Sequence, residues 1–552
     1  MASQAPILAS PRVAPLRESF SFTSVTSDQP VRDAVVSKSA IALLPRPENR
    51  QLQHYSTQLR LQLQWRPAAK LQLLMLRNAV GCVVAAGLAN GCFYSGNIFS
   101  LKSSTEQSRP EFLMATLVWT AVVHSVKMTA AYLPSLMTQR FLKFPDYTPG
   151  LWFCAKKLVK GTSSYFAVSL AGMVAIGLLI QHTSLMCEHF GYKLHFYLGN
   201  LLNLVFTTGI AIVARRIYYE ETYLGHDQVS DNSESRQAAH SAATRAATPP
   251  ARKAHRPPNY RSTSFWREYM VQFPKAILVA FCGAFVHLVS WYGALNRGTM
   301  VIMGFTILGI VIKLALQEAA RHYILKKQIR SVRTMCVLVG LPTVLIDTQT
   351  RIVLLGTQTN TFLVAGTVAM AAAEICLRVG KAAFVLWTIR RRANALEQKL
   401  LDLSATAPQS REGGPSPTSL KLEFELWKRQ VISYHTAEVT ADMYAEYISI
   451  GCSQSIVFWW VGHPLYPALQ VTETESAMNL QDVARWRFNQ GAMLAFQFMV
   501  ENVVDYVCVV MEMAAGIDFE RIESLSTFLG VLFMMMAVLN INLSSVVYLS
   551  VT

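Results

Sequence analysis

Residues 491–516 read GAMLAFQFMVENVVDYVCVVMEMAAG and give the clearest indication of the fold class. The stretch is long and apolar enough to form a helix across the hydrocarbon core of a membrane, which takes about 20 residues. It contains no Lys or Arg, yet it carries Glu501, Asp505 and Glu512. Ionisable side chains at this depth need either water or an opposite charge. The sequence therefore predicts a membrane protein with a polar feature inside it.

Similar stretches recur along the 552 residues. Hydrophobic residues make up 52% of the chain and charged residues only 15%, against about 25% charged in soluble domains. The sequence predicts an all-α fold, a polytopic transmembrane helical bundle of about 11 spans. The predicted spans are 79–100, 112–134, 163–182, 194–214, 275–293, 299–316, 334–356, 361–387, 435–461, 491–515 and 526–549.

The seventh of these stretches differs from the others, because Pro342, Asp347 and Arg351 interrupt it. We expect either a full crossing or a broken or re-entrant segment over 334–356, which would leave ten crossings. Asp347 and Arg351 are four residues apart, a spacing that favours a local ion pair within one helix. The same spacing predicts a second local pair between Glu374 and Arg378 in the eighth span.

Basic residues are distributed unequally among the loops. Residues 135–162 and 317–333 each hold five Lys or Arg, whereas 183–192 and 357–360 hold none. Cytosolic loops of membrane proteins carry the excess of Lys and Arg. This contrast predicts a cytosolic N-terminus and, with an odd number of spans, an extracytosolic C-terminus, in the plasma membrane or an endomembrane.

Two polar linkers divide the predicted spans into blocks of four, four and three. Residues 225–265 and 404–420 are rich in Ser, Ala, Thr and Pro, a composition that buries too little apolar area to fold alone. Both segments are candidate binding sites for cytosolic protein partners. The predicted organisation is a largely disordered cytosolic tail (1–78) whose basic segment 49–77 lies on the inner leaflet, a four-span block (79–214), a disordered linker (215–274), a second four-span block (275–387), a linker with a helical start (388–434) and a three-span block with acidic faces (435–552).

The acids of the last block are the candidate functional residues. Glu501, Asp505 and Glu512 are spaced i, i+4 and i+11, which places them within a sector of about 40° on one helix face. Glu438, Asp442 and Glu446 form a similar stripe at i, i+4 and i+8 on the ninth span. Each charge in hydrocarbon costs at least ~2.5 kcal/mol, so such acids are expected to face a partner or a water-filled cavity. Facing stripes of this kind predict a seam that binds protons or cations.

The alternative is that these acids only hold the bundle together by pairing with bases on other helices. The sequence offers four intramembrane partners, which are Lys127 and His124 in the second span, His287 in the fifth and Lys313 in the sixth. Buried ion pairs of this kind leave no exchangeable site.

Other classes of function find little support. The chain has no nucleotide-binding or catalytic motif, so we expect no enzyme, no cofactor and no metal centre. The net charge of +16 lies beside apolar spans, so no nucleic-acid partner is expected. The leading hypothesis is a proton- or cation-coupled secondary transporter in the lipid bilayer, with a proton, cation or small solute as ligand. The alternative is a non-transporting membrane scaffold or receptor whose cytosolic linkers bind partners.

Overall fold

The computed structural model describes residues 50–143, 149–183, 193–226, 264–291, 299–327, 329, 331–355, 360–405, 417–460, 463–469, 480–517, 519, 522 and 524–549. Within these residues the fold is all-helical and contains no strand. The long helices are α1 (Arg50–Tyr94), α2 (Arg109–Met137), α3 (Leu151–His182), α5 (Leu194–Glu221), α7 (Phe265–Trp291), α8 (Thr299–Lys326), α9 (Val332–Leu355), α10 (Asn360–Ala405), α11 (Pro417–Trp460), α12 (Leu480–Ala514) and α14 (Ser526–Val547).

Nine of these helices are long and apolar enough to cross a membrane, and α10 and α11 are the two that are not among them. The part of the chain that the structure describes is therefore a multi-pass helical bundle with nine candidate membrane spans. The predicted total of about 11 spans stays a prediction, because nine candidates are found within the described residues.

Helix α11 tolerates its charges because protein surrounds it. Almost every residue from 431 to 457 is buried. The helix packs against α1, α8, α9, α10, α12 and α14. Its polar side chains therefore meet neighbouring helices instead of lipid, and the energetic penalty for charge in hydrocarbon depends on what those neighbours offer.

Helix α9 favours the full crossing over the broken or re-entrant alternative for the seventh predicted span. It runs without interruption from Val332 to Leu355 with Pro342 inside it, and it forms one of the nine candidate spans. The helix is mostly buried, and Asp347 and Arg351 each form an ion pair with another helix. Because these charges are compensated inside the bundle, the segment has no need to unwind around them.

Helix α1 begins earlier than predicted. The helix begins at Arg50, whereas the first predicted span begins at residue 79. Ala68, Leu71 and Met75 are fully buried in the main hydrophobic core. The basic segment 49–77 is continuous with the first predicted span in one helix. Its contact with the inner leaflet stays a prediction. Residues 1–49 of the predicted tail lie outside the described residues.

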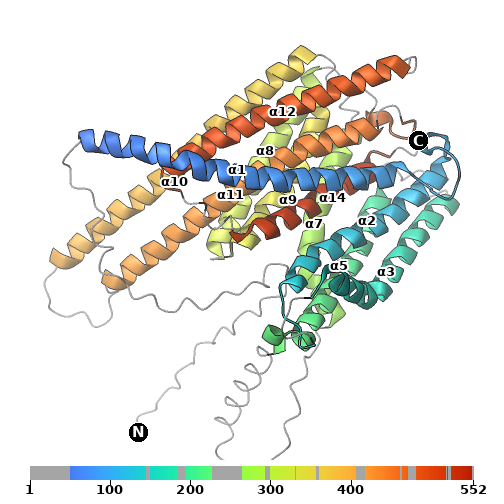
Figure 1. The fold of residues 1–552 in the computed structure, drawn as a ribbon, viewed down its shortest axis with the longest axis horizontal. Helices are drawn as coiled ribbons and strands as arrows, with labels where there is room; N and C mark the ends of the chain where they lie inside the picture. The colour runs from blue at the N-terminus through green and yellow to red at the C-terminus, as the bar shows by residue number, and fades with distance from the viewer. Residues whose placement is uncertain are drawn as a thin grey trace, which may run out of the picture.

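The helices gather into two groups, which Figure 1 shows on opposite sides of the bundle. One group contains α2, α3 and α5, which pack against one another. The other contains α8, α9, α10, α11 and α12. Helices α1 and α14 contact both groups, and α7 joins α5 to α9. The predicted partner-binding segments 225–265 and 404–420 lie largely outside the described residues.

Candidate functional site

The acids of α12 point into the second group of helices. Glu501, Asp505 and Glu512 are all buried. The Glu501 carboxylate accepts a hydrogen bond of 2.6 Å from Arg351 of α9. Arg378 of α10 donates to Asp505, and its second amino group lies 3.4 Å from Glu512. The acidic face of α12 therefore packs against two arginines from two different helices.

The acids of α11 face α8 and α10. Lys381 donates a hydrogen bond of 2.9 Å to Glu438 and lies 3.7 Å from Asp442. Gln317 of α8 donates to Asp442 at 2.7 Å, and Lys313 lies 3.8 Å from the same carboxylate. Asp442 is thus a shared acceptor that links α8, α10 and α11.

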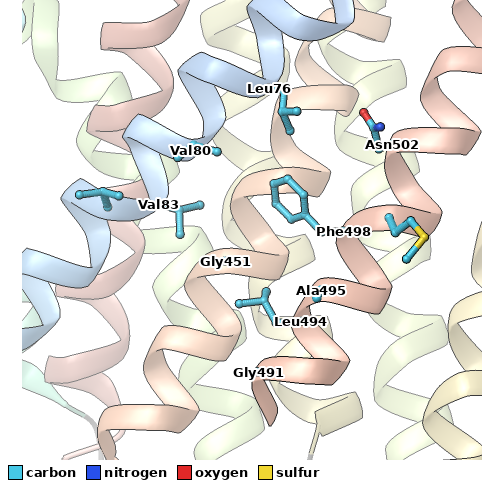
Figure 2. Close-up of a pocket in the computed structure, with 11 residues that line it drawn as sticks. Leu76, Val80, Val83, Gly451, Gly491, Leu494, Ala495, Phe498 and Asn502 are labelled. Atoms are coloured by element: carbon cyan, nitrogen blue, oxygen red, sulfur yellow. The ribbon is translucent and has the colours of Figure 1, made fainter. Parts of the chain in front are cut away.

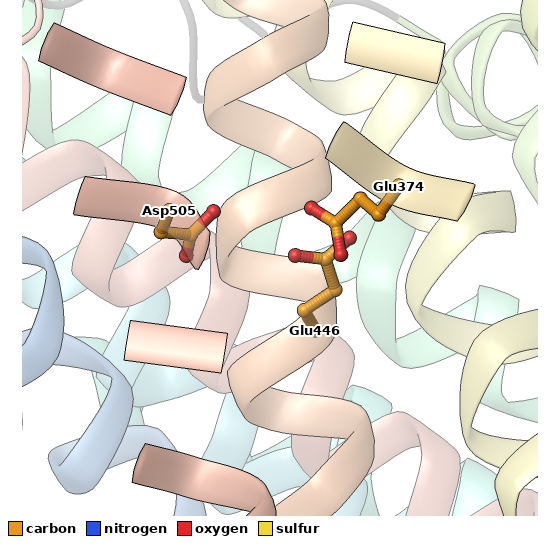
Figure 3. A group of neighbouring side chains, drawn as sticks. All are labelled: Glu374, Glu446 and Asp505. Atoms are coloured by element: carbon orange, nitrogen blue, oxygen red, sulfur yellow. The ribbon is translucent and has the colours of Figure 1, made fainter. Parts of the chain in front are cut away.

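Three carboxyl groups from three helices meet at the centre of this region. Figure 3 shows Glu374 of α10, Glu446 of α11 and Asp505 of α12 turned toward one another. One oxygen of each lies within 4.8 Å of an oxygen of the other two. Carboxylate oxygens are the ligands that hard cations such as Ca²⁺ and Mg²⁺ prefer. The arrangement suits either a bound cation or carboxyl groups that share protons.

Acids outnumber bases in this region, which we call the acidic core. Its contacts join eight carboxyl groups to four cationic side chains, so full ionisation would give this set four more negative charges than positive ones. Like charges close together in a low dielectric are strongly unfavourable. The acidic core consists of Asp347, Glu374, Glu438, Asp442, Glu446, Glu501, Asp505 and Glu512 with Lys313, Arg351, Arg378 and Lys381.

Several of these carboxyl groups also have an unused oxygen. Five of them keep one buried oxygen that has no hydrogen-bond partner among the described residues. Buried polar atoms in proteins are almost always hydrogen bonded, so each exception calls for an explanation. The atoms are Glu374 Oε1, Glu446 Oε2, Glu501 Oε2, Asp505 Oδ2 and Glu512 Oε1.

Only one of the four predicted intramembrane partners reaches the acids. Lys313 donates a hydrogen bond of 2.8 Å to Asp347. Lys127 is buried on α2, which packs against α3, α5 and α14, and it forms no ion pair with a described residue. His124 on the same helix lies 2.9 Å from the Thr207 hydroxyl. His287 of α7 lies against Trp291. Helix packing therefore separates these three from the acidic core.

The two predicted local pairs have different outcomes. Arg378 lies 3.6 Å from Glu374, so this i, i+4 contact is present, although Arg378 also serves Asp505 and Glu512. The expected pair of Asp347 with Arg351 is replaced, because Asp347 pairs with Lys313 and Arg351 pairs with Glu501. The long side chain of Arg351 reaches the buried Glu501 on another helix. Glu501 therefore replaces Asp347, four residues earlier in α9, as the partner of Arg351.

Sequence reasoning missed three polar residues of the region. Lys381 continues the spacing of Glu374 and Arg378 by one more turn, and this periodicity was the signal for it. Gln317 accepts a hydrogen bond of 3.1 Å from Lys381 while it donates to Asp442. His435 is buried on α11, and neither ring nitrogen has a hydrogen-bond partner among the described residues. No sequence pattern singled out the last two.

A buried ion pair outside the acidic core has equal numbers of acidic and basic side chains. Arg215 of α5 and Glu268 of α7 form two parallel hydrogen bonds of 2.9 and 3.0 Å. Their side chains are 7% and 4% exposed. One acid meets one base in the geometry that guanidinium and carboxylate groups favour. The two charges of this closed pair cancel, and Lys275 on α7 also lies close enough to Glu268 to interact with it.

Comparison with known proteins adds no family assignment. No protein-family model, no curated protein and no solved structure matches the chain.

Proposed function

We propose that the acidic core binds exchangeable protons or cations and that the protein is a proton- or cation-coupled secondary transporter. The observation that carries this proposal is the excess of carboxyl groups over cationic side chains, eight against four, inside a membrane bundle. Ionisable groups inside membrane bundles mark ion pathways and proton relays.

The roles divide between the two acidic stripes. Glu446, Asp505 and Glu374 form the candidate binding centre, because their oxygens converge. Glu501 and Glu512 lie beside it on α12 and are held by Arg351 and Arg378. A proton or cation at the centre would lower the local negative charge and so weaken the hold of these arginines on their acids. Binding would then be coupled to the contacts between α9, α10 and α12.

The test is transport by the full-length protein in liposomes. An imposed pH or Na⁺ gradient is expected to decay faster in proteoliposomes than in empty liposomes. Asp505→Asn and Glu446→Gln should each bring the rate back to that of empty liposomes. Glu220→Gln, an exposed pair member on α5, is the matched control and should leave the rate unchanged. Unchanged flux in both core variants would refute the proposal.

A second candidate function is supported by the ion pairs themselves. Arg351 with Glu501 and Arg378 with Asp505 are close contacts of the kind that hold helices together. A scaffold or receptor would use this bundle as a rigid base and recruit partners through 225–265 or 404–420. Specific capture of a cytosolic protein by peptides with these sequences, together with no flux above empty liposomes, would favour it.

A further inference from the structure

Lys381 of α10 is the most exposed of the four cationic side chains in the acidic core. Its side chain is 29% exposed, whereas the other three are 18% exposed or less. Lysine carries a compact charge on a flexible four-carbon stem, so its ammonium group can move to a new position while the helix stays in place. Lys381 is therefore the cation of this region that can most readily leave its acids.

The Lys381 ammonium group lies among three oxygen atoms from two other helices. It donates a hydrogen bond of 2.9 Å to Glu438 of α11 and one of 3.1 Å to the side-chain oxygen of Gln317 of α8. A carboxylate oxygen of Asp442 lies 3.7 Å away. Carboxylate and amide oxygens are also the ligands that hard metal cations prefer. We call the three residues Glu438, Asp442 and Gln317 the Lys381 subsite.

The oxygen atoms of this subsite are held in place by contacts other than Lys381. Glu438 and Asp442 lie one turn apart on the same face of α11, in a stretch of that helix that is almost entirely buried. The Gln317 amide nitrogen donates to Asp442 at 2.7 Å, which leaves the Gln317 oxygen for the ammonium group. The ligands therefore keep their arrangement when the ammonium group leaves, and a free cation would find them already positioned.

Exposure within the acidic core falls from the Lys381 subsite toward α12. The Glu438 and Asp442 side chains are each 11% exposed, whereas that of Asp505 is completely buried. Charged side chains of a membrane bundle that are partly exposed face water, because exposure to hydrocarbon is costly. An ion that enters the acidic core from the α8 and α10 side therefore meets the Lys381 subsite before it reaches Asp505.

The surface of the bundle between α1 and α12 is a poor entry for a cation. A groove of about 480 Å³ lies there, and Figure 2 shows apolar side chains such as Val80, Val83 and Phe498 along it. Asn502 is the one polar side chain among the described residues that line it. Apolar walls do not replace the hydration of an ion. The charges of the protein thus favour entry through the Lys381 subsite.

The next acid along α11 leads from the subsite to the carboxyl groups at the centre. Glu446 lies one turn beyond Asp442 on the same helix face, and a carboxyl oxygen of Glu446 converges with oxygens of Glu374 and Asp505. Glu446 Oε2 is buried and has no hydrogen-bond partner among the described residues. An unused oxygen one turn further in offers the next ligand to a cation that leaves Asp442.

We infer that Lys381 is a tethered substitute for the substrate, and that K⁺ or Na⁺ enters the acidic core by displacing its ammonium group from the Lys381 subsite. The inference rests on the proposed function and narrows the ligand to a monovalent metal cation. An ammonium group and K⁺ have the same charge and similar radii, so the exchange preserves the charge of the subsite. Because a tethered group competes at a high effective concentration, Lys381 sets the affinity for the entering ion.

The first experiment measures the reactivity of Lys381 in the full-length, unmodified protein in detergent micelles. A succinimidyl ester acylates exposed amines, and mass spectrometry quantifies each lysine. K⁺ or Na⁺ replaces N-methylglucamine ion at constant ionic strength, since this bulky cation does not fit the subsite. Acylation of Lys381 should rise about tenfold, because the metal ion shifts the released form from a minor to a major population.

Two other lysines and one variant are the controls for this labelling. Lys428 is exposed on α11 near Glu425 and should react equally under all conditions. Lys313 donates to Asp347 at 2.8 Å and should stay protected. Glu438→Gln removes the charge of the nearest acceptor, so Lys381 should react readily without added K⁺ or Na⁺ and respond no further to them.

The second experiment measures binding of radioactive Na⁺ and of Rb⁺, an analogue of K⁺, to the same preparations. Lys381→Met removes the tethered cation and should lower the apparent Kd by about tenfold. Lys381→Arg keeps the charge and should not tighten binding. Lys428→Met, on the exposed part of α11, is the matched control and should leave the Kd unchanged.

Three results of the labelling would overturn the inference. The first is acylation of Lys381 that responds to neither K⁺ nor Na⁺. The second is release of Lys313 together with Lys381, which would mean general loosening of the bundle. The third is release by Ca²⁺ and by neither monovalent ion, which would contradict the assigned class of cation.

The two proposals fail in different ways. Release of Lys381 by K⁺ or Na⁺ together with unchanged flux in Asp505→Asn and Glu446→Gln removes the transport function and keeps the cation subsite. Flux that depends on Asp505, together with a Lys381 reactivity that neither ion changes, keeps the proposed function and removes the subsite.

Discussion

Two buried regions of this protein compensate their charged side chains in different ways. Between α5 and α7, one arginine meets one glutamate in a two-pronged contact, and the charges cancel. Between α8 and α12, eight carboxyl groups surround four cationic side chains, and five carboxyl oxygens keep no hydrogen-bond partner among the described residues. A region built only for stability resembles the first. The second region has more carboxyl groups than cationic side chains, so it requires protons or cations for charge balance. This surplus of acids distinguishes the candidate site from the structural pair.

The largest effect is expected at Arg378, because one guanidinium group serves Glu374, Asp505 and Glu512. Removing one partner of a buried pair costs about 3–5 kcal/mol, and Arg378→Gln removes the cation from three acids. The free energy of unfolding in mixed micelles should fall by more than for any other variant below. The loss should shrink at acidic pH, where protons neutralise the stranded acids. Arg378→Lys should retain most of the stability, and an equal loss in both variants would contradict the charge argument.

A large loss of stability is also expected when one member of the Arg215–Glu268 pair is replaced, and replacement of both members should restore it. Glu268→Gln leaves Arg215 buried without its counter-charge and should lower the free energy of unfolding by about 3–5 kcal/mol. Replacing both residues by apolar ones, as in Arg215→Met with Glu268→Leu, should recover nearly all of it, since a buried ion pair is often no better than apolar packing. Chemical denaturation of the single and double variants measures this. A double variant as unstable as the single one would show that the pair has a role beyond charge balance.

The same Glu→Gln change in the acidic core should behave in the opposite way. Glu446 is one of several acids in surplus and has no ion pair within 4.0 Å among the described residues. Glu446→Gln removes a like charge, so the free energy of unfolding should change by no more than about 1 kcal/mol or should rise. Ion flux should nevertheless be lost. A loss of stability as large as that of Glu268→Gln would make the two regions equivalent and would break the comparison.

The smallest effect is expected at the surface. Arg216 and Glu220 form an i, i+4 pair on α5 whose side chains are 66% and 41% exposed. Exposed pairs contribute about 0.5 kcal/mol or less. Glu220→Gln should therefore unfold within that margin of the unmodified protein and sets the baseline for the other variants. A larger loss would mean that the unfolding assay responds to charge at any depth.

The helices were more predictable than their contacts. Apolar stretches of spanning length indicated α2, α5 and α14 directly, because lipid demands about 20 apolar residues wherever a helix faces it. Helix α11 was harder to delimit, since neighbouring helices surround it and relax that demand. The length of α1 was underestimated because its buried stripe begins in a segment that also carries Arg66 and Lys70.

The acidic faces of α11 and α12 were visible as spacings along one helix, but their partners were not. Arg351 and Glu501 are 150 residues apart in the chain, and only the fold brings the Arg351 side chain of α9 within reach of Glu501 on α12. The local spacing of Asp347 and Arg351 therefore gave the wrong pair. Gln72 belongs to the same group of contacts, since it reaches Tyr447 from a helix that begins the fold. Periodicity within a helix predicts which residues share a face and does not predict which face lies opposite.

The most direct test of the central claim is an infrared titration of the carboxyl groups in the full-length protein and in Glu446→Gln. If the acidic core holds more carboxyl groups than counter-charges, the protein at neutral pH without added metal cations should show a protonated-carboxyl band. That band should decrease when base or a metal cation is added, and it should be smaller in Glu446→Gln. A spectrum in which every carboxyl group is ionised, or a band that Glu446→Gln leaves unchanged, would contradict the account.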